Sequence, residues 1–300
     1  MAARAPIGGK VVVITGAARG IGELLAQKLA RRGARLALLG LEPERLESVA
    51  DRCGPNAASW DVDVTDARRL TEAAVEVVDR FRRVDVLVAN AGIAAGGTLL
   101  VADPASYERV IEVNLLGSIR TARAFLPHLV KSRGYLLQIA SLAAMTPAPL
   151  MGAYCSSKAG VEAFAQVLRT EVAHHGVRVG VAYLSWTDTD MTRGAAELRR
   201  EEELRRRLPP PLGTVYPLEP AVERLVTGIE RRSARVYGQS WIRTVRPLRW
   251  LAPDIGYAIG RGAAAEGEAD LAARGPDYTR PVGAGGQADT AARARSRSVG

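Results

Sequence analysis

Cysteine and aromatic residues are scarce in this sequence. Its 300 residues include only two cysteines, Cys53 and Cys155, and the three aromatic types together make up 5% of the chain. Two thiols are too few for a disulfide-rich fold or a thiolate metal cluster, and they fall in an expected loop and at an expected helix start. We therefore expect free thiols, no structural disulfide and no metal site.

Long hydrophobic runs are also missing. The apolar stretches at 11–14 and 84–89 are far shorter than the roughly 20 residues that a membrane-spanning helix needs. Residues 1–10 lack the apolar block and small-residue cleavage site of a secretory signal. These absences argue against a transmembrane protein and lead us to expect a cytoplasmic one.

Lysine is rare, although the chain is basic. The formal net charge is +9, and residues 191–300 hold 19 Arg against 13 Asp and Glu, which is +6 of that total. No helix-turn-helix, zinc-finger or aromatic RNA-binding signature accompanies this charge, so we expect no nucleic-acid partner. A compositional bias of the source genome is an ordinary explanation for the arginine.

What is present from residue 10 to about 183 is a regular alternation of short apolar runs with longer amphipathic stretches. This pattern is typical of a doubly wound parallel sheet with helices on both faces, in three α/β/α layers. The expected strands are 11–15, 35–39, 57–61, 84–89, 135–140 and 178–183. The expected helices are 21–32, 43–51, 66–81, 104–130 with a possible break, 152–174 and 219–232.

The regularity weakens after Met191. A charged stretch at 197–208 ends in three prolines, and 241–260 is an apolar segment interleaved with arginines. Beyond Gly260 the chain is rich in Ala, Gly and Arg, with little to bury. We expect a catalytic domain over 1–240, an amphipathic basic extension over 241–260 and a poorly ordered tail over 261–300.

A glycine-rich turn follows the first expected strand. It contains Gly16, Arg19, Gly20, Ile21 and Gly22, and a helix pattern begins at once. Glycines let a backbone turn tightly around a pyrophosphate, whose charge then sits at the positive end of a helix. The strand and helix on either side make this a candidate phosphate-binding turn.

The most informative pattern is Tyr154 followed four residues later by Lys158. This spacing places both side chains on one face of the expected helix. Ser141 ends the preceding strand and Asn114 stands in the long helix before it. Taken singly, each has an ordinary structural explanation: a strand end, a break in a helix, core packing or a solvated charge. Their joint placement favours a catalytic group.

These motifs resemble the short-chain dehydrogenases/reductases, which have a Rossmann-type fold. The spacing Thr-Gly-x-x-x-Gly-Ile-Gly matches that family's turn, and Asn90, Ala91 and Gly92 resemble its Asn-Ala-Gly motif. Asp63 and Val64 stand where the family contacts the adenine. The resemblance covers residues 10 to about 191.

The resemblance implies a role for each member of the tetrad. Tyr154 would exchange a proton with the substrate oxygen, although its ordinary pKa of about 10 calls for a nearby cation, which Lys158 could supply. In the family, the equivalent lysine also binds the nicotinamide ribose. Ser141 would hold the substrate oxygen, and Asn114 would position a water that links Lys158 to solvent.

Two positions bear on the cofactor. Arg19 resembles the phosphate-binding arginine of many NADP users, so NADP is favoured over NAD, although it could also be a solvated loop residue. The sequence departs from the family where Leu184 and Ser185 replace its usual Pro-Gly. Thr189 still falls where the family's threonine contacts the nicotinamide carboxamide.

The sequence therefore indicates an oxidoreductase acting on a hydrophobic alcohol or ketone, assembled as a homo-oligomer, dimer or tetramer. An alternative is a non-catalytic dinucleotide-binding regulator or scaffold of the same fold. A third hypothesis, peripheral membrane contact, draws on the tryptophans and arginines of 241–251 and is not favoured over a lid or an interface.

Overall fold

The computed structural model describes residues 6–197, 205–206, 208, 210–275 and 279–298. Most of the charged stretch expected at 197–208 therefore lies outside the described residues. Within them, no helix is both long and apolar enough to cross a membrane.

A seven-stranded parallel sheet forms the centre of the molecule, in the order β3-β2-β1-β4-β5-β6-β7. The expected fold class is confirmed, and all six expected strands are present. The seventh strand was not expected, because it is a three-residue strand at the sheet edge. The strands are β1 (Val11–Thr15), β2 (Arg35–Gly40), β3 (Ala57–Asp61), β4 (Val86–Ala89), β5 (Tyr135–Ile139), β6 (Arg178–Tyr183) and β7 (Arg235–Tyr237).

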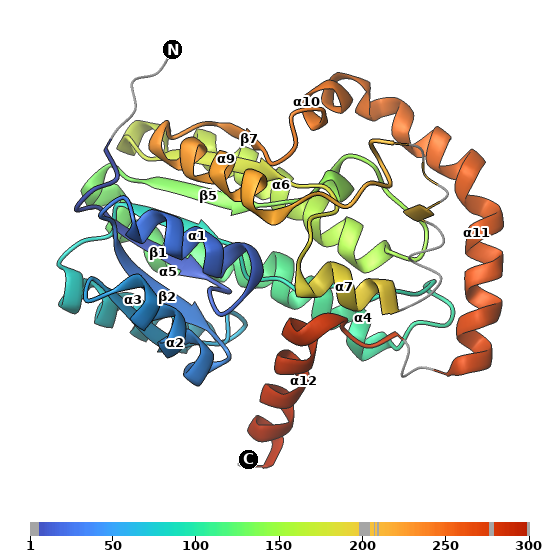
Figure 1. Cartoon of the computed structure of the whole chain (residues 1–300), viewed down its shortest axis with the longest axis horizontal. Coiled ribbons are helices and arrows are strands. Elements are labelled where there is room, and N and C mark those ends of the chain that lie inside the picture. Colours follow the sequence, from blue (N-terminus) through green and yellow to red (C-terminus); the bar gives the residue numbers. More distant parts are fainter. Residues whose placement is uncertain (1–5, 198–204, 207, 209, 276–278, 299–300) are drawn as a thin grey trace.

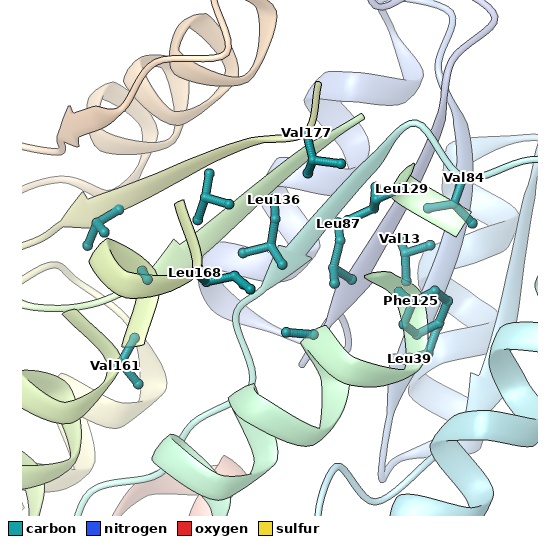
Figure 2. Packing of buried hydrophobic residues seen from close by; sticks show 14 of the residues in the cluster. Val13, Leu39, Val84, Leu87, Phe125, Leu129, Leu136, Val161, Leu168 and Val177 are labelled. Atoms are coloured by element: carbon teal, nitrogen blue, oxygen red, sulfur yellow. The ribbon is translucent and has the colours of Figure 1, made fainter. Parts of the chain in front are cut away.

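Helices cover both faces of the sheet because its central strands are apolar on both sides. Along β1, Val11 and Val13 face one hydrophobic cluster, whereas Val12 and Ile14 face the other. Helices α3, α5 and α6 cover the first cluster, and α1, α2 and α9 cover the second. Figure 2 shows strand residues of the first cluster beside Phe125 of α5. The helices are α1 (Gly20–Ala30), α2 (Pro43–Cys53), α3 (Ala67–Phe81), α4 (Pro104–Ile111), α5 (Gly117–Ser132), α6 (Gly152–Glu171), α7 (Asp190–Glu197) and α9 (Leu218–Glu230).

The long helix expected over 104–130 is interrupted at Asn114, one of the four candidate catalytic residues. A π-helical turn, Glu112–Leu116, separates α4 from α5 and contains Asn114. A π-turn adds a residue to the helical turn and so displaces the helix register locally. Here it accompanies a fully buried Asn114, with 0% of its surface exposed.

The C-terminal region differs from its expectation, since the stretch over 261–300 that we expected to be poorly ordered is largely helical. After the short α10 (Ile242–Val245) come a 3-10 segment (Arg246–Leu251), α11 (Ala252–Arg274) and α12 (Gly283–Ser298). Alanine and arginine are strong helix formers, which compensates for the few large side chains. In Figure 1, α11 curves along one side of the molecule, and α12 leaves the body beside α4 and α7.

Because of its two tryptophans, we also expect 241–259 to fold back over the substrate cleft or a subunit edge, and in the structure the start of α11 packs on the sheet domain. A Cβ atom built on Gly260 would lie 3.0 Å from Pro149 Cγ, and one on Gly256 would lie 3.2 Å from the Pro147 carbonyl oxygen. The helix thus lies against the loop between β5 and α6. Trp241 packs on the core, whereas Trp250 is 69% exposed.

Candidate active site

A cleft opens at the carboxyl ends of the strands, where the order reverses between β1 and β4. In wound parallel sheets, ligands bind at this switch point. Most of the residues expected from sequence line it together: Gly16, Arg19, Gly20, Ile21, Asp63, Val64, Asn90, Ala91, Gly92, Ser141, Tyr154, Lys158 and Thr189. Gly22 and Asn114 are not in the lining, but each contacts a residue that is.

The turn after β1 needs glycine for space as well as for conformation. Gly16 has φ +63°, and a Cβ on it would lie 2.8 Å from the Cα of Ala91. A Cβ on Gly22 would overlap the carbonyl oxygen of Gly16. The turn therefore packs directly against the end of β4. Because its glycines carry no side chains, its backbone can approach a phosphate in the cleft closely.

Asn90 connects the ends of β4 and β1. Its side-chain Nδ2 donates to the carbonyl oxygens of Thr15, at 2.9 Å, and Gly16, at 3.1 Å. Its backbone N–H donates to the Thr15 hydroxyl at 3.0 Å. These bonds hold the glycine turn against the neighbouring strand end.

Helix α6 presents Tyr154 and Lys158 to the cleft from its first two turns. The Lys158 Nζ lies 5.7 Å from the centre of the Tyr154 ring. It also donates to the carbonyl oxygen of Ile139 at the end of β5, at 3.0 Å. The ammonium group is thus fixed between the tyrosine and the sheet.

Asn114 bonds to the strand-end loop behind the cleft. Its Oδ1 accepts from the Ile93 N–H at 2.8 Å, and its Nδ2 donates to the Ile93 carbonyl at 2.9 Å and to Ser157 Oγ at 3.0 Å. A Cβ on Gly92 would come within 3.1 Å of Asn114 Oδ1 and 3.4 Å of Lys158 Nζ. The glycine therefore provides the space in which asparagine and lysine approach each other.

Burial governs the protonation of the tetrad. Burial raises the pKa of Tyr154 to about 12, and the polar Ser141 side chain opposes that rise. Burial lowers the pKa of Lys158 to about 8. At neutral pH the tyrosine is protonated, and the lysine still carries its charge in most molecules.

The family's Pro-Gly is replaced here by a differently bonded backbone. The carbonyl of Leu184 accepts from the Leu142 N–H at 2.8 Å and from the Ser141 hydroxyl at 3.3 Å. The N–H of Ser185 donates to the side chain of Gln239 at 2.9 Å. The end of β6 is thus held from both sides, and it positions the hydroxyl of Ser141.

Arg19 lies in the cleft wall, where its guanidinium group contacts two acids. It donates from Nε to Glu42 at 2.9 Å and from Nη1 to Asp190 at 3.0 Å, and Nη2 bonds Glu42 as well. Burial lowers the pKa of Arg19, but the two carboxylates outweigh it and raise that pKa above its ordinary value. A phosphate at this position would have to compete with Glu42.

Sequence reasoning missed a buried cation behind the opposite wall, where it contacts the lining residues Asp63 and Asp289. Arg109 of α4 donates to Asp63 at 2.9 Å, to Thr65 at 2.9 Å and to Asp289 of α12 at 2.7 Å. Although burial acts to raise it, hydrogen bonds from Thr65 and the charge of Arg109 hold the pKa of Asp63 below its ordinary value. No local pattern could pair residues 180 positions apart.

The comparisons with known proteins agree with this geometry. The pattern of the family described as short chain dehydrogenase matches residues 10–200. The chain belongs to that family. As a short-chain dehydrogenase it is an NAD(P)-dependent oxidoreductase acting on CH–OH groups.

Among its relatives is the 11-beta-hydroxysteroid dehydrogenase-like 4A of Arabidopsis thaliana. The two are 32% identical over 257 residues, which cover 83% of each chain. An uncharacterized oxidoreductase of Staphylococcus epidermidis is 33% identical over 186 residues, covering 62% of this chain and 81% of that protein.

Two solved structures show the same fold. A metagenomic short-chain oxidoreductase in complex with NADP is 34% identical, with a TM-score of 0.57, covering 60% of this chain and 83% of that one. A short chain dehydrogenase/reductase from Burkholderia phymatum in complex with NAD is 23% identical, with a TM-score of 0.70, covering 80% of this chain and 93% of that one.

Proposed function

We propose that this short-chain dehydrogenase transfers a hydride between NADP(H) and a hydrophobic alcohol or ketone, with Tyr154 as its general acid and base. The observation that carries the proposal is that the partly buried Tyr154 lines the same cleft as Ser141, Lys158 and the glycine turn. A proton-transferring group and a dinucleotide cradle thus share one cavity.

The residues of the cleft fit a nicotinamide dinucleotide. The turn at Gly16 and Gly20 would hold the pyrophosphate, and Asp63 with Val64 would lie at the adenine. At the other end, the Ser185 hydroxyl is buried without a hydrogen-bond partner among the described residues, and Thr189 lies nearby in the lining. An orphaned polar atom is a natural partner for a carboxamide. When bound, the cofactor supplies or accepts the hydride.

The protein's own groups manage the proton and the substrate oxygen. Because burial keeps Tyr154 protonated at neutral pH, the residue is ready to donate to a carbonyl oxygen as negative charge develops there. Ser141 donates a second hydrogen bond to that oxygen once its hydroxyl turns from Leu184. Lys158 stabilises the phenolate that remains after donation, and Asn114 holds the backbone beside it.

For the cofactor we propose a preference for NADP(H), with NAD(H) also accepted. Arg19 supports this preference because it lies in the cleft wall at the turn. Its bonds to Glu42 and Asp190 weaken the preference, because an acid at the end of β2 suits the ribose hydroxyls of NAD. The balance between Arg19 and Glu42 therefore decides the choice.

An apolar substrate is favoured by the walls around the nicotinamide end. Leu184, Met191 and Val282 line the cleft there, beside the tetrad. Such walls bind a hydrophobic ketone or alcohol better than a sugar or an acid. We propose that substrate class and leave its carbon skeleton open.

Self-association of the chain is a further part of the proposal, through the helices around Asn114 and Tyr154 that pair in the family. Of the apolar residues expected to add to this surface, Val161 and Leu168 of α6 are buried within the core at 0% and 6% exposure, and Phe164 is partly buried. Leu116 of the π-turn and Val167 of α6 are 40% and 57% exposed, and we propose that they contribute apolar area to this interface. Sedimentation of the purified chain tests this directly.

Replacing Tyr154 with phenylalanine tests the catalytic proposal. The Tyr154→Phe variant keeps the ring but loses the proton, so we expect turnover of a ketone panel with NADPH to fall by about 100- to 10,000-fold. Dinucleotide binding, followed by fluorescence, should change little. Retained turnover would overturn the mechanism, and a wild-type chain that binds dinucleotide but reduces no ketone would favour the non-catalytic alternative.

A further inference from the structure

A C-terminal segment of the chain forms one wall of the cleft. We call residues 279–289 the strap. Its members Val282, Gly285, Gly286, Ala288 and Asp289 line the same cavity as the glycine turn and the tetrad. In Figure 1 the strap corresponds to the beginning of α12, where that helix leaves the body beside α4 and α7.

The strap is fixed to the catalytic domain at its first end. The Thr279 hydroxyl accepts from the Asp103 N–H at 2.9 Å, and the Val282 N–H donates to the Ala94 carbonyl at 2.8 Å. Gly283 then passes Gly194 of α7 so closely that a Cβ on Gly194 would overlap its backbone. Close backbone packing of this kind indicates a specific docking position.

A buried ion pair fixes the other end. Asp289 and Arg109 are 2% and 7% exposed, and the carboxylate accepts from Arg109 Nε, at 3.1 Å to each oxygen, and from Nη2 at 2.7 Å. The same guanidinium group holds Asp63, which lines the cleft. Burying two charges costs free energy unless their hydrogen bonds are nearly all made. Here Arg109 donates to Asp289 on one side and to Asp63 on the other.

The strap covers the cleft without filling it. Its residues facing the cavity are mainly small, Gly285, Gly286 and Ala288, so space remains over the glycine turn and the tetrad. A Cβ on Gly285 would lie 3.8 Å from Cδ of Arg19 on the opposite wall. The strap therefore reaches from the Asp63 side of the cleft to the Arg19 side.

We propose that the strap is the outer wall of the dinucleotide site, and that the Asp289–Arg109 pair is a latch that slows release of the bound dinucleotide. This inference rests on the proposed function, because it assumes that a dinucleotide occupies the cleft. Asp289 and Arg109 act as positioning residues: Asp289 holds the strap, and Arg109 joins it to Asp63. A dinucleotide then leaves only when the latch opens.

The test measures the dissociation of NADPH and NADH by rapid mixing and cofactor fluorescence. In Asp289→Asn, we expect the dissociation rate to rise about tenfold, as loss of a charge-assisted contact implies. Asp289→Glu keeps the charge and should recover part of the slow release. Asp270→Asn is the matched control, since it makes the same acid-to-amide change in an ion pair with Arg274 within α11; its release should be as slow as in wild type.

A chain ending at residue 278 removes the strap altogether. We expect it to release the dinucleotide at least as fast as Asp289→Asn, with a larger rise in the cofactor KM than fall in kcat. Tighter cofactor binding by this chain would overturn the proposal and show that the strap competes with the dinucleotide. Unchanged release in both variants would also overturn it. If the wild-type protein binds no dinucleotide at all, the proposed function itself has failed. That result differs from both tighter binding and unchanged release in the variants.

Discussion

Glycines at the centre of the sheet domain and on the outer face of α11 have different surroundings. Gly22 of α1 and Gly180 of β6 occupy positions where a Cβ would overlap neighbouring atoms. Gly262 of α11 has no atom within 4 Å of where its Cβ would lie. At Gly22 and Gly180 packing dictates the residue, whereas at Gly262 it does not, although Gly267 on the inner face of the same helix would bring a Cβ within 2.7 Å of Leu150. Only one face of α11 is therefore constrained by packing, which makes its sequence pattern weaker than that of the sheet domain.

The large apolar side chains show the same contrast. Every residue of β1 is buried, whereas Trp250, Ile255 and Tyr257 near the start of α11 are 69%, 54% and 72% exposed. The C-terminal helices are attached by a few specific contacts, among them Arg249 to the buried Glu162 at 2.8 Å. Such contacts fix position without burying a continuous apolar face.

The largest effect is expected at the functional centre of the sheet domain, from Lys158→Met. Methionine keeps the length of the side chain but removes the charge that we propose stabilises the Tyr154 phenolate. We expect kcat/KM for ketone reduction to fall by about 1,000-fold, within the range of general acid-base terms. Steady-state kinetics with NADPH measures this, and a fall below about tenfold would contradict the assigned role.

The same variant should be more stable than wild type at neutral pH. Burial lowers the pKa of Lys158 to about 8, so below pH 8 the folded state carries a disfavoured charge. Removing it should raise the free energy of unfolding at pH 7 by about 2 kcal/mol, after allowing for the lost bond to Ile139. Between pH 8 and about 10.5 the unfolded chain binds more protons than the folded one, so wild-type stability rises and the difference should shrink. Urea unfolding across this range checks the sign.

The next effect tests packing in the sheet, through Gly180→Ala. A Cβ at this buried position would overlap the Ser233 carbonyl and the Tyr135 hydroxyl, which are themselves hydrogen-bonded at 2.8 Å. Overpacking of a rigid site should lower the free energy of unfolding by about 3 kcal/mol. Denaturant unfolding measures the loss, and a neutral result would show that β6 and the loop before β7 can separate at little cost.

Much of the fold was predictable because its signals are local. Strands β1, β3 and β6 begin and end where the apolar runs indicate, and the spacing of Tyr154 and Lys158 predicted that both side chains face one cleft. The latch was not predictable, since Arg109 and Asp289 are joined only by the tertiary fold. Arg19 was expected in the cleft, but its two acidic partners were not, because Asp190 is 171 residues away. Helices α11 and α12 were missed because low apolar content was taken to mean disorder.

A smaller effect should follow from changing Arg19 or Glu42, which we propose favour the 2′-phosphate of NADP and the ribose hydroxyls of NAD, respectively. Arg19→Ala removes the expected phosphate contact and should lower the NADP-to-NAD ratio of kcat/KM by about tenfold. Glu42→Gln frees the guanidinium and should raise that ratio by a few-fold. The two variants serve as controls for each other. If the ion pair were purely structural, breaking it from either side would change the NADP-to-NAD ratio of kcat/KM in the same direction. An unchanged ratio in both would show that neither residue selects the cofactor.

The smallest effect is expected in the tail, from Gly262→Ala. Gly262 is exposed within α11, and alanine has the higher helix propensity, so the substitution should stabilise the helix by about 0.5 to 1 kcal/mol. Because few contacts hold α11 to the sheet domain, we expect the substitution to raise the free energy of local opening of α11 and to leave that of global unfolding unchanged. Hydrogen exchange of α11 amides should slow by about two- to fivefold, while that of β1 should stay unchanged. Gly180→Ala is the matched comparison, since the same change made in the sheet destabilises. If Gly262→Ala also destabilises, a Cβ there meets something that the single chain does not contain, and a second copy packed on this face of α11 becomes the better explanation.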